Sequence, residues 1–347
     1  MCGAPHRIRC LLPALADQPD RVRGAPRILT SRGPPPGKST SLTRIDFGYN
    51  PPSGTRGIER FPAATFVRDL QDVLDVASQS FSSLWVSDHL MTEEPFRMDV
   101  WTELTWIAAR YPGPMLGTIV LANSFRHPPL MAKMAASLQA FSHGRLILGY
   151  GAGWLEREYR AYGYEFPPAR TRIEQMVEAL QLMRLMWTTS PATFHGTYYH
   201  VEDAYCEPRP HPLPIIMIGG DGEQRTLRAV AEYADWWNNV MRPLPVLRHK
   251  LDVLEQHCRD VGRDYASIRK TITRVVYLAS TRSEAERWAG AKLESPTPPF
   301  AGEPSALIDH LHELVELGFD LFQMVFAGFP DTTDLRLFVD KVLPAFA

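Results

Sequence analysis

The sequence predicts an α/β fold, a closed TIM (β/α)8 barrel with insertions. Short apolar runs stop abruptly at polar or glycine residues, as parallel strands buried on both faces do. Eight such runs alternate with helical patterns, which favours a parallel sheet closed into a barrel. The chain from residue 44 onward is somewhat longer than the roughly 250 residues typical of that fold, which leaves room for insertions. A doubly wound open sheet is the alternative architecture.

The composition is that of an ordinary soluble globular protein. The chain has 347 residues, of which 45% are hydrophobic and 22% charged, and its formal net charge is -2. A charge so close to zero gives no reason to expect nucleic acid or an acidic membrane surface as a partner. No apolar run approaches the roughly 20 residues that cross a bilayer. Four scattered cysteines without metal-ligand spacing predict reduced thiols, a cytoplasmic protein and no metal site.

The composition of residues 1–43 does not predict a part of the folded domain. The segment is rich in arginine, and RGPPPGKSTS at 32–41 has the composition of a linker. We expect a disordered extension, or a start codon assigned too early. The short apolar segment CLLPALA at 10–16 leaves a weak targeting signal as the alternative. The domain is therefore expected to span residues 44–347 as a single barrel.

Each expected strand is a run of apolar, largely β-compatible residues. The clearest are LWVSDH, MLGTIVL and GRLILGYGAG, each of which ends in polar or glycine residues. The expected strands span 44–50, 84–89, 115–121, 144–153, 214–220, 235–240, 271–279 and 319–328.

Apolar residues at helical spacing predict a helix after each strand. Phe66, Leu70 and Val73 show this pattern first, and Pro128 opens a later helix, since proline suits a first helical turn. An inserted segment at about 188–213 breaks the rhythm, and its aromatic alternation around Gly196 predicts a hairpin. The expected helices span 66–77, 101–108, 128–141, 172–187, 226–231, 246–258, 283–292, 305–317 and 335–346.

Asp88 and His89 end the second expected strand, and the carboxyl ends of barrel strands carry the active sites of this fold. An imidazole there can move a proton near neutral pH, and a neighbouring carboxylate can orient a ligand or accept a hydrogen bond. Alternatively, His89 is a core histidine with a satisfied partner and Asp88 caps the next helix.

Two glycine-rich loops follow other strands, GYGAGW at 149–154 and IGGDGEQ at 218–224. Small residues let backbone N–H groups approach a ligand, and a helix start favours anions. Trp154 stands where a dinucleotide fingerprint would carry its third glycine, so that fingerprint is not supported. A tight strand-to-helix turn explains either loop alone. Two such loops in one barrel indicate a long phosphate-bearing ligand.

Four motifs in order resemble one known family. They are the Asp88-His89 pair, LGTIVLANSFRHP at 116–128, SHGRLILGYGAGW at 142–154, and the segment from IGG to AEYADWWN at 218–238. They look like the bacterial luciferase-like flavin monooxygenase superfamily, and specifically like its branch of deazaflavin (coenzyme F420)-dependent oxidoreductases. The resemblance covers nearly everything from about residue 45 to residue 346.

The resemblance implies that the barrel holds the deazaflavin ring of coenzyme F420 deep in its mouth. Asp88 and His89 map to the family's catalytic pair, in which the histidine donates or accepts a proton near the reactive ring carbon. A cis peptide between Ile119 and Val120 is implied behind the ring, and a homodimer is implied because family members are commonly dimers. The implied cofactor-binding residues are Asp88, Thr118, Ile119, Val120, Ala122, Gly151, Ala152, Gly153, Gly219, Gly220 and Gly222.

The implied function is hydride transfer between coenzyme F420 and a small organic substrate. Two alternatives stay open: an FMN-dependent two-component monooxygenase that uses reduced flavin and oxygen, and a non-catalytic flavin-binding barrel. Sugar-phosphate dehydrogenases of the superfamily carry a glutamate where Trp154 stands and an aromatic residue at about Glu93. We therefore expect a different substrate here, with Glu93 as a candidate partner of His89.

Overall fold

The computed structural model describes residues 44–54, 63–92 and 96–347. The extension expected at 1–43 and the candidate Glu93 lie outside these residues.

Eight parallel strands form a closed barrel, which confirms the predicted fold class. Neighbouring strands pair in parallel all the way round, and β12 pairs with β1, with Phe47 opposite Phe322. A doubly wound open sheet is therefore excluded. The barrel strands are β1 (Asp46–Tyr49), β2 (Ser83–Val86), β3 (Met115–Thr118), β5 (Leu146–Gly151), β8 (Ile215–Gly219), β9 (Trp236–Val240), β10 (Arg269–Leu278) and β12 (Leu321–Phe326).

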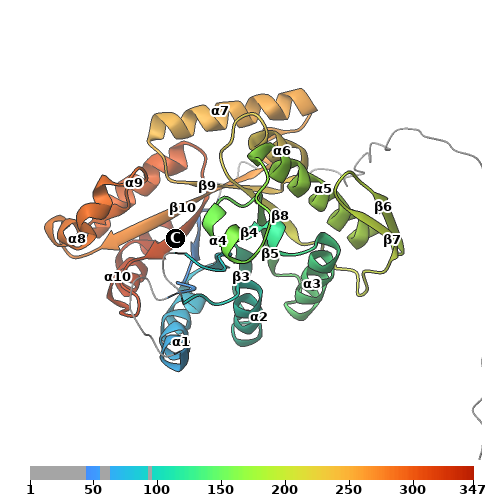
Figure 1. Ribbon diagram of the computed structural model, residues 1–347. Helices are drawn as coiled ribbons and strands as arrows, with labels where there is room; N and C mark the ends of the chain where they lie inside the picture. The colour runs from blue at the N-terminus through green and yellow to red at the C-terminus, as the bar shows by residue number, and fades with distance from the viewer. Residues whose placement is uncertain (1–43, 55–62, 93–95) are drawn as a thin grey trace, which may run out of the picture. The chain divides into compact units, whose positions relative to one another are not determined.

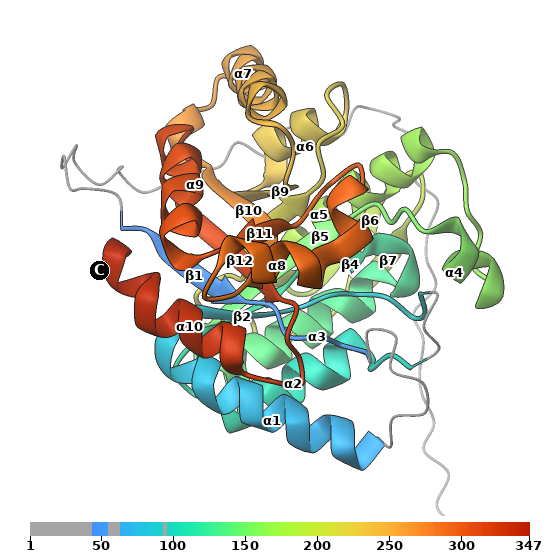
Figure 2. The ribbon, with the colours of Figure 1, turned by 90° about the vertical axis from the view of Figure 1, so that its left-hand side faces the viewer.

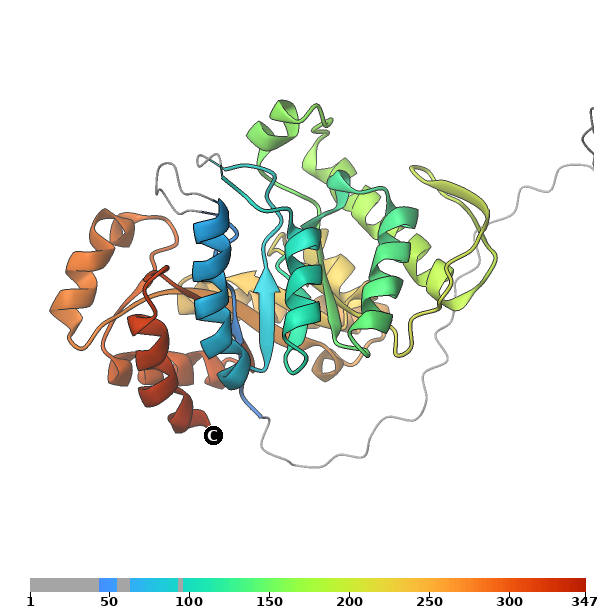
Figure 3. The same cartoon turned by 90° about the horizontal axis from the view of Figure 1, so that it is seen from below.

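Helices surround the strands and alternate with them, as predicted (Figure 1). Figure 3 shows the first three, α1 to α3, next to one another on one flank of the barrel. In Figure 2 the last helix, α10, lies along the first helix, α1. The helices are α1 (Ala63–Ser80), α2 (Val100–Arg110), α3 (Pro128–Phe141), α5 (Ala169–Thr188), α6 (Thr226–Tyr233), α7 (Leu244–Val261), α8 (Arg282–Ala289), α9 (Pro304–Glu316) and α10 (Thr333–Lys341).

Two apolar layers stabilise the barrel. Outward-facing strand residues such as Leu84, Leu116 and Leu148 are fully buried against the helices. Alternate residues point into the barrel, where a separate cluster forms around the fully buried Trp85. Because both faces of each strand are covered, the strands read as nearly continuous apolar runs. The interior cluster is Trp85, Ile147, Met217 and Leu321.

The strand expected at 115–121 is divided into two pieces. β3 ends at Thr118, a cis peptide joins Ile119 to Val120, and β4 (Leu121–Ala122) then pairs with β5. The cis peptide stands where the resemblance implied one. The apolar run is continuous in the sequence, so its pattern alone does not show the break.

The inserted segment contains the predicted hairpin, formed by β6 (Ala192–His195) and β7 (His200–Ala204) in antiparallel pairing. The helix expected at 335–346 is shorter, because α10 ends at Lys341 and a 3-10 turn follows. Two elements were not predicted, α4 (Glu156–Ala161) and β11 (Phe300–Gly302), since each is too short to show a period.

Candidate active site

The strand ends expected to share one rim do so, because β2, β3, β5 and β8 are consecutive neighbours in the barrel. The Ala122 amide donates to Asp88 Oδ2 over 2.9 Å and joins β4 to the end of β2. Val120 lies against both glycine loops. A Cβ atom on Gly151 would come within 2.8 Å of Val120 Cγ2, and one on Gly219 within 2.9 Å of Val120 Cγ1. The structure thus brings the main candidate residues together at the carboxyl mouth of the barrel.

Asp88 is buried in an ion pair at this mouth. Its Oδ2 accepts a hydrogen bond from Arg126 Nη1 at 2.8 Å, and Arg126 Nη2 also donates to Asp99 Oδ2 at 2.8 Å. Burial raises the pKa of the Asp88 carboxyl, while the Arg126 guanidinium and the Ala122 amide oppose that rise. Asp88 therefore holds the ends of β2 and β4 in place beside His89, a positioning role that depends on Arg126.

His89 pairs with a carboxylate that the sequence patterns did not indicate. Its Nδ1 lies 3.1 Å from Oε1 of Glu158 in α4, and Glu158 Oε2 accepts the Leu90 amide over 3.0 Å. The Glu158 side chain is only 3% exposed. A carboxylate can only accept hydrogen bonds, so a neutral His89 ring carries its proton on Nδ1 and leaves Nε2 as an acceptor. The two residues are 69 positions apart, and no spacing rule connects them.

The loop after β5 passes the mouth as Ala152, Gly153 and Trp154. Gly153 has a φ of 74°, and the Tyr159 hydroxyl occupies the space that a side chain would need, so glycine is required. Tyr159 is held by Phe125, with ring centroids 4.8 Å apart. The tight turn considered as an alternative is therefore present, and its half-buried small residues border the mouth.

The second glycine loop leaves β8 at Gly219 and leads to α6. Gly220 has a φ of 119°, its amide donates to the Asn238 carbonyl at 3.1 Å, and its carbonyl accepts Trp237 Nε1 at 2.8 Å. Gly222 lies beside Thr226, the first residue of α6. The loop therefore reaches a helix start as predicted, but the Gly220 amide is already bonded within the fold.

Two further candidates make structural hydrogen bonds. Thr118 is fully buried, and its hydroxyl donates to the Gly149 carbonyl at 2.8 Å. The Ala122 amide is bonded to Asp88, as described above. These two hydrogen bonds join β3 and β4 to their neighbours. The Thr118 hydroxyl and the Ala122 amide are therefore already used within the fold.

Two exposed valines lie at the mouth, above the polar side chains of the barrel interior. Val240 and Val275, at the carboxyl ends of β9 and β10, are 47% and 40% exposed. Strand alternation places them on the inner face with Asn238 and Thr271, whose side chains bond to each other at 3.2 Å. β10 lies across the barrel from β3, which carries Val120 towards the same space. Apolar side chains exposed at a concave site are typical of ligand pockets. These residues fit a flat apolar group such as a flavin-type ring.

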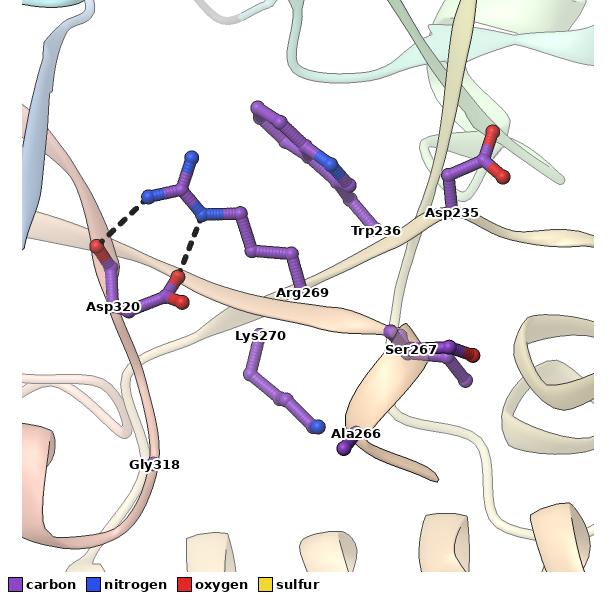
Figure 4. A pocket seen from close by; sticks show the side chains of 9 residues that line it. Asp235, Trp236, Ala266, Ser267, Arg269, Lys270, Gly318 and Asp320 are labelled. Atoms are coloured by element: carbon purple, nitrogen blue, oxygen red, sulfur yellow. Dashed lines mark hydrogen bonds and ion pairs between the residues drawn. The ribbon is translucent and has the colours of Figure 1, made fainter. Parts of the chain in front are cut away.

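A different cavity, of about 390 Å³, lies at the amino ends of β9, β10 and β12 (Figure 4). Arg269 there bridges Asp46 and Asp320, each at 2.7 Å, and lies over the Trp236 ring at 4.9 Å. Barrel active sites lie at the carboxyl ends of the strands, and contacts at the amino ends usually serve stability. The Arg269 cluster therefore closes the lower end of the barrel.

Among residues 44–54, 63–92 and 96–347, no group of three His, Cys, Asp or Glu side chains is placed to hold a metal ion. The same part of the chain contains no helix long and apolar enough to cross a membrane.

A closed parallel barrel with a histidine–carboxylate pair and two glycine loops at its carboxyl mouth has the architecture of a TIM-barrel enzyme. Residues 62–309 match the family model of luciferase-like monooxygenases. Because this match spans more than half of the chain, the protein belongs to that family.

Curated relatives match part of the chain. The F420-dependent glucose-6-phosphate dehydrogenase of Kineococcus radiotolerans is 37% identical over 155 residues, which is 42% of this chain and 44% of the relative. The enzyme of the same name from Amycolatopsis mediterranei is 34% identical over 163 residues, 44% of this chain and 48% of the relative. The chain thus spans about half the length of the curated relatives it matches.

Solved structures match nearly all of the chain. An F420-dependent secondary alcohol dehydrogenase in complex with an F420-acetone adduct has a TM-score of 0.73 and 18% identity, covering 88% of this chain and 99% of its own. The monooxygenase RslO1 from Streptomyces bottropensis has a TM-score of 0.75 and 20% identity, covering 87% of this chain and 100% of its own. At such identities the likeness establishes the fold.

Proposed function

We propose that the protein is an oxidoreductase that transfers a hydride between coenzyme F420 and a small organic substrate. The observation that carries the proposal is the pair of His89 with the buried Glu158 at the carboxyl mouth. A barrel that only stored a cofactor would have no use for an oriented proton-transferring imidazole. The names of the curated relatives, which match about half of their own length, support F420 as the cofactor.

The side chains at the mouth suit the deazaflavin ring in polarity. Val120, Val240 and Val275 offer apolar surface to the ring, and the glycine loops allow the backbone to approach it. Coenzyme F420, when bound, supplies the hydride chemistry at its ring. The protein then has to orient the ring, exclude water and handle the proton.

His89 is the residue we assign to the proton. Glu158 holds Nδ1–H, which leaves Nε2 free to accept a proton from a substrate hydroxyl or, once protonated, to donate one to a carbonyl oxygen. Glu158 also stabilises the imidazolium that forms when Nε2 takes up a proton. Asp88 acts indirectly, since it fixes the strand end that carries His89.

The test is a pair of titrations with the purified protein. Adding protein to F420 should quench the coenzyme's fluorescence in a saturable way, whereas FMN should bind at least about tenfold more weakly. His89→Ala should bind F420 as the wild type does and lose most turnover in a screen of alcohols and ketones. A variant that turns over like the wild type would remove His89 from the mechanism.

A second candidate is the FMN-dependent two-component monooxygenase. Its support is the description of the matching family and the likeness to the monooxygenase RslO1. Saturable FMN binding without F420 binding would favour it. Binding of F420 with no redox reaction in the whole substrate screen would instead favour the non-catalytic barrel.

The proposal includes a cytoplasmic homodimer. Cys206 and Cys258 are unpaired and buried, which fits a reducing compartment. Leu130 and Phe141 of α3 are exposed apolar side chains of the kind that subunit interfaces cover. Light scattering on the purified protein should give the mass of two chains, and the mass of one chain would contradict the dimer.

A further inference from the structure

Trp154 is a large exposed aromatic side chain at the mouth. It is 70% exposed and meets the His89 ring edge-on, with centroids 5.9 Å apart and planes at 88°. Tyr162 is also exposed on this side of the mouth, and its hydroxyl donates to the Leu90 carbonyl at 3.1 Å. Aromatic surface is costly to leave in water, and it is concentrated here at the residue assigned to proton transfer.

Contacts within the fold fix the backbone on both sides of Trp154. Before it, Gly153 adopts the left-handed conformation against Tyr159. After it, Glu158 anchors α4 to the Leu90 amide and to His89. Trp154 therefore stands beside His89 with most of its surface free to contact a substrate.

The charges around His89 do not favour an anion. The His89 ring is paired with the Glu158 carboxylate. Arg126, the cation beside Asp88, is already shared between Asp88 and Asp99 at 2.8 Å each. A phosphate group beside His89 would meet a carboxylate and a neutralised arginine, which costs binding energy.

We propose that the substrate is an uncharged, mainly apolar molecule with a flat ring that lies against Trp154, and with a hydroxyl or carbonyl oxygen directed at His89 Nε2. This inference rests on the proposed function. In the oxidising direction the carbinol C–H bond breaks and its electron pair leaves as a hydride to F420, the oxidant. The hydroxyl proton passes to His89 Nε2, and the carbon–oxygen double bond of the ketone forms.

The same surface sets this chain apart from a sugar-phosphate enzyme. Glucose 6-phosphate has no apolar face large enough for the indole and carries a dianion. It should therefore bind poorly here, although the curated relatives are named for it.

The experiment titrates F420-loaded protein with acetophenone and, separately, with glucose 6-phosphate, following F420 fluorescence and heat of binding. Acetophenone should bind, and Trp154→Ala should weaken it about tenfold, or ~1.4 kcal/mol. Trp154→Phe should restore most of that affinity. Trp288→Ala, a half-exposed tryptophan on α8 that packs on Tyr277, is the control and should bind like the wild type. Glucose 6-phosphate should give no saturable signal.

Three results would overturn the inference: no acetophenone binding, equal acetophenone affinity in Trp154→Ala and wild type, or saturable binding of glucose 6-phosphate. In each of these cases F420 is bound, so the proposed hydride-transfer function would stand. A protein that does not take up F420 at all would remove the proposed function and this inference together.

Discussion

Replacing Glu158 by glutamine tests whether the carboxylate sets the tautomer of His89. Glutamine keeps the shape of glutamate but offers one acceptor oxygen and an NH2 group that can only donate. The Leu90 amide, 3.0 Å from Oε2, needs the oxygen. The NH2 group must then face His89 Nδ1, which becomes an acceptor, and the ring proton moves to Nε2.

The size of the effect follows from the lost bond. A hydrogen bond to a charged group contributes roughly 1.5–3 kcal/mol, and at 3% exposure water has little access to replace the Glu158 oxygen at 3.1 Å from Nδ1. Each 1.36 kcal/mol is a factor of about ten in rate. We therefore expect kcat to fall about 10- to 100-fold, while the Kd for F420 changes less than about twofold.

Two assays separate this effect from general damage. Steady-state kinetics with an alcohol or ketone substrate gives kcat and KM, and nitrogen-15 NMR of the histidine rings reports which nitrogen carries the proton. The wild type should show His89 protonated on Nδ1, and Glu158→Gln on Nε2. Glu156→Gln, on the exposed side of the same helix, should change neither. An unchanged tautomer, or a loss of F420 binding as large as the loss of kcat, would refute the reasoning.

Three further predictions concern binding and stability. Gly219→Ala should weaken F420 binding at least about tenfold, because the new Cβ pushes Val120 into the mouth. Asp88→Asn should lower the free energy of unfolding in urea by about 1.5–3 kcal/mol, since it removes one of the two carboxylates that pair with Arg126, the buried one. Burial raises the pKa of the Glu103 carboxyl from 4.5 to about 8. The protonated carboxyl therefore contributes its full amount to the free energy of unfolding below pH 4.5, and this contribution is lost as pH rises through about 8. Glu103→Gln should remove this pH dependence, which amounts to ~1.4 kcal/mol per pH unit between those two pKa values. Denaturation curves recorded at pH 5 to 9 measure it.

Each of these three predictions has a matched control. Gly113→Ala adds a methyl group with nothing within 4 Å and should leave F420 binding unchanged. Adding Val120→Ala to Gly219→Ala should restore affinity, and failure of that rescue would show that Val120 is not the cause. Glu156→Gln breaks an exposed pair with Arg160 and should cost less than about 0.5 kcal/mol, in contrast to Asp88→Asn. Parallel pH curves for wild type and Glu103→Gln would contradict the assignment to Glu103.

The strands and most helices could be predicted because the pattern that determines each lies within a short stretch of sequence. An apolar run such as LILGYG is typical of a strand that is buried on both faces of a parallel sheet. The spacing of Phe66, Leu70 and Val73 places all three on one face of a helix. The alternation of the two patterns then implies a parallel sheet. The fold class follows from information within short windows of the sequence.

The candidate site depends on contacts between residues that are far apart in the sequence. Glu158 meets His89 only because α4, a helix of six residues, folds back onto the loop after β2. The divided third strand likewise involves a long-range contact, since Asp88 accepts the Ala122 amide of β4 34 residues away. Asp88 and His89 could be proposed from their place at a strand end, whereas their partners Arg126 and Glu158 are visible only in three dimensions.

The most direct measurement is a crystal structure of the protein grown with coenzyme F420. The deazaflavin ring should lie in the carboxyl mouth against Val120, with its reactive carbon on the side of His89 and its tail along the loop at Gly219. Density for the coenzyme in the Arg269 cavity at the other end of the barrel, or a mouth filled by the protein's own side chains, would contradict the assignment of the active site.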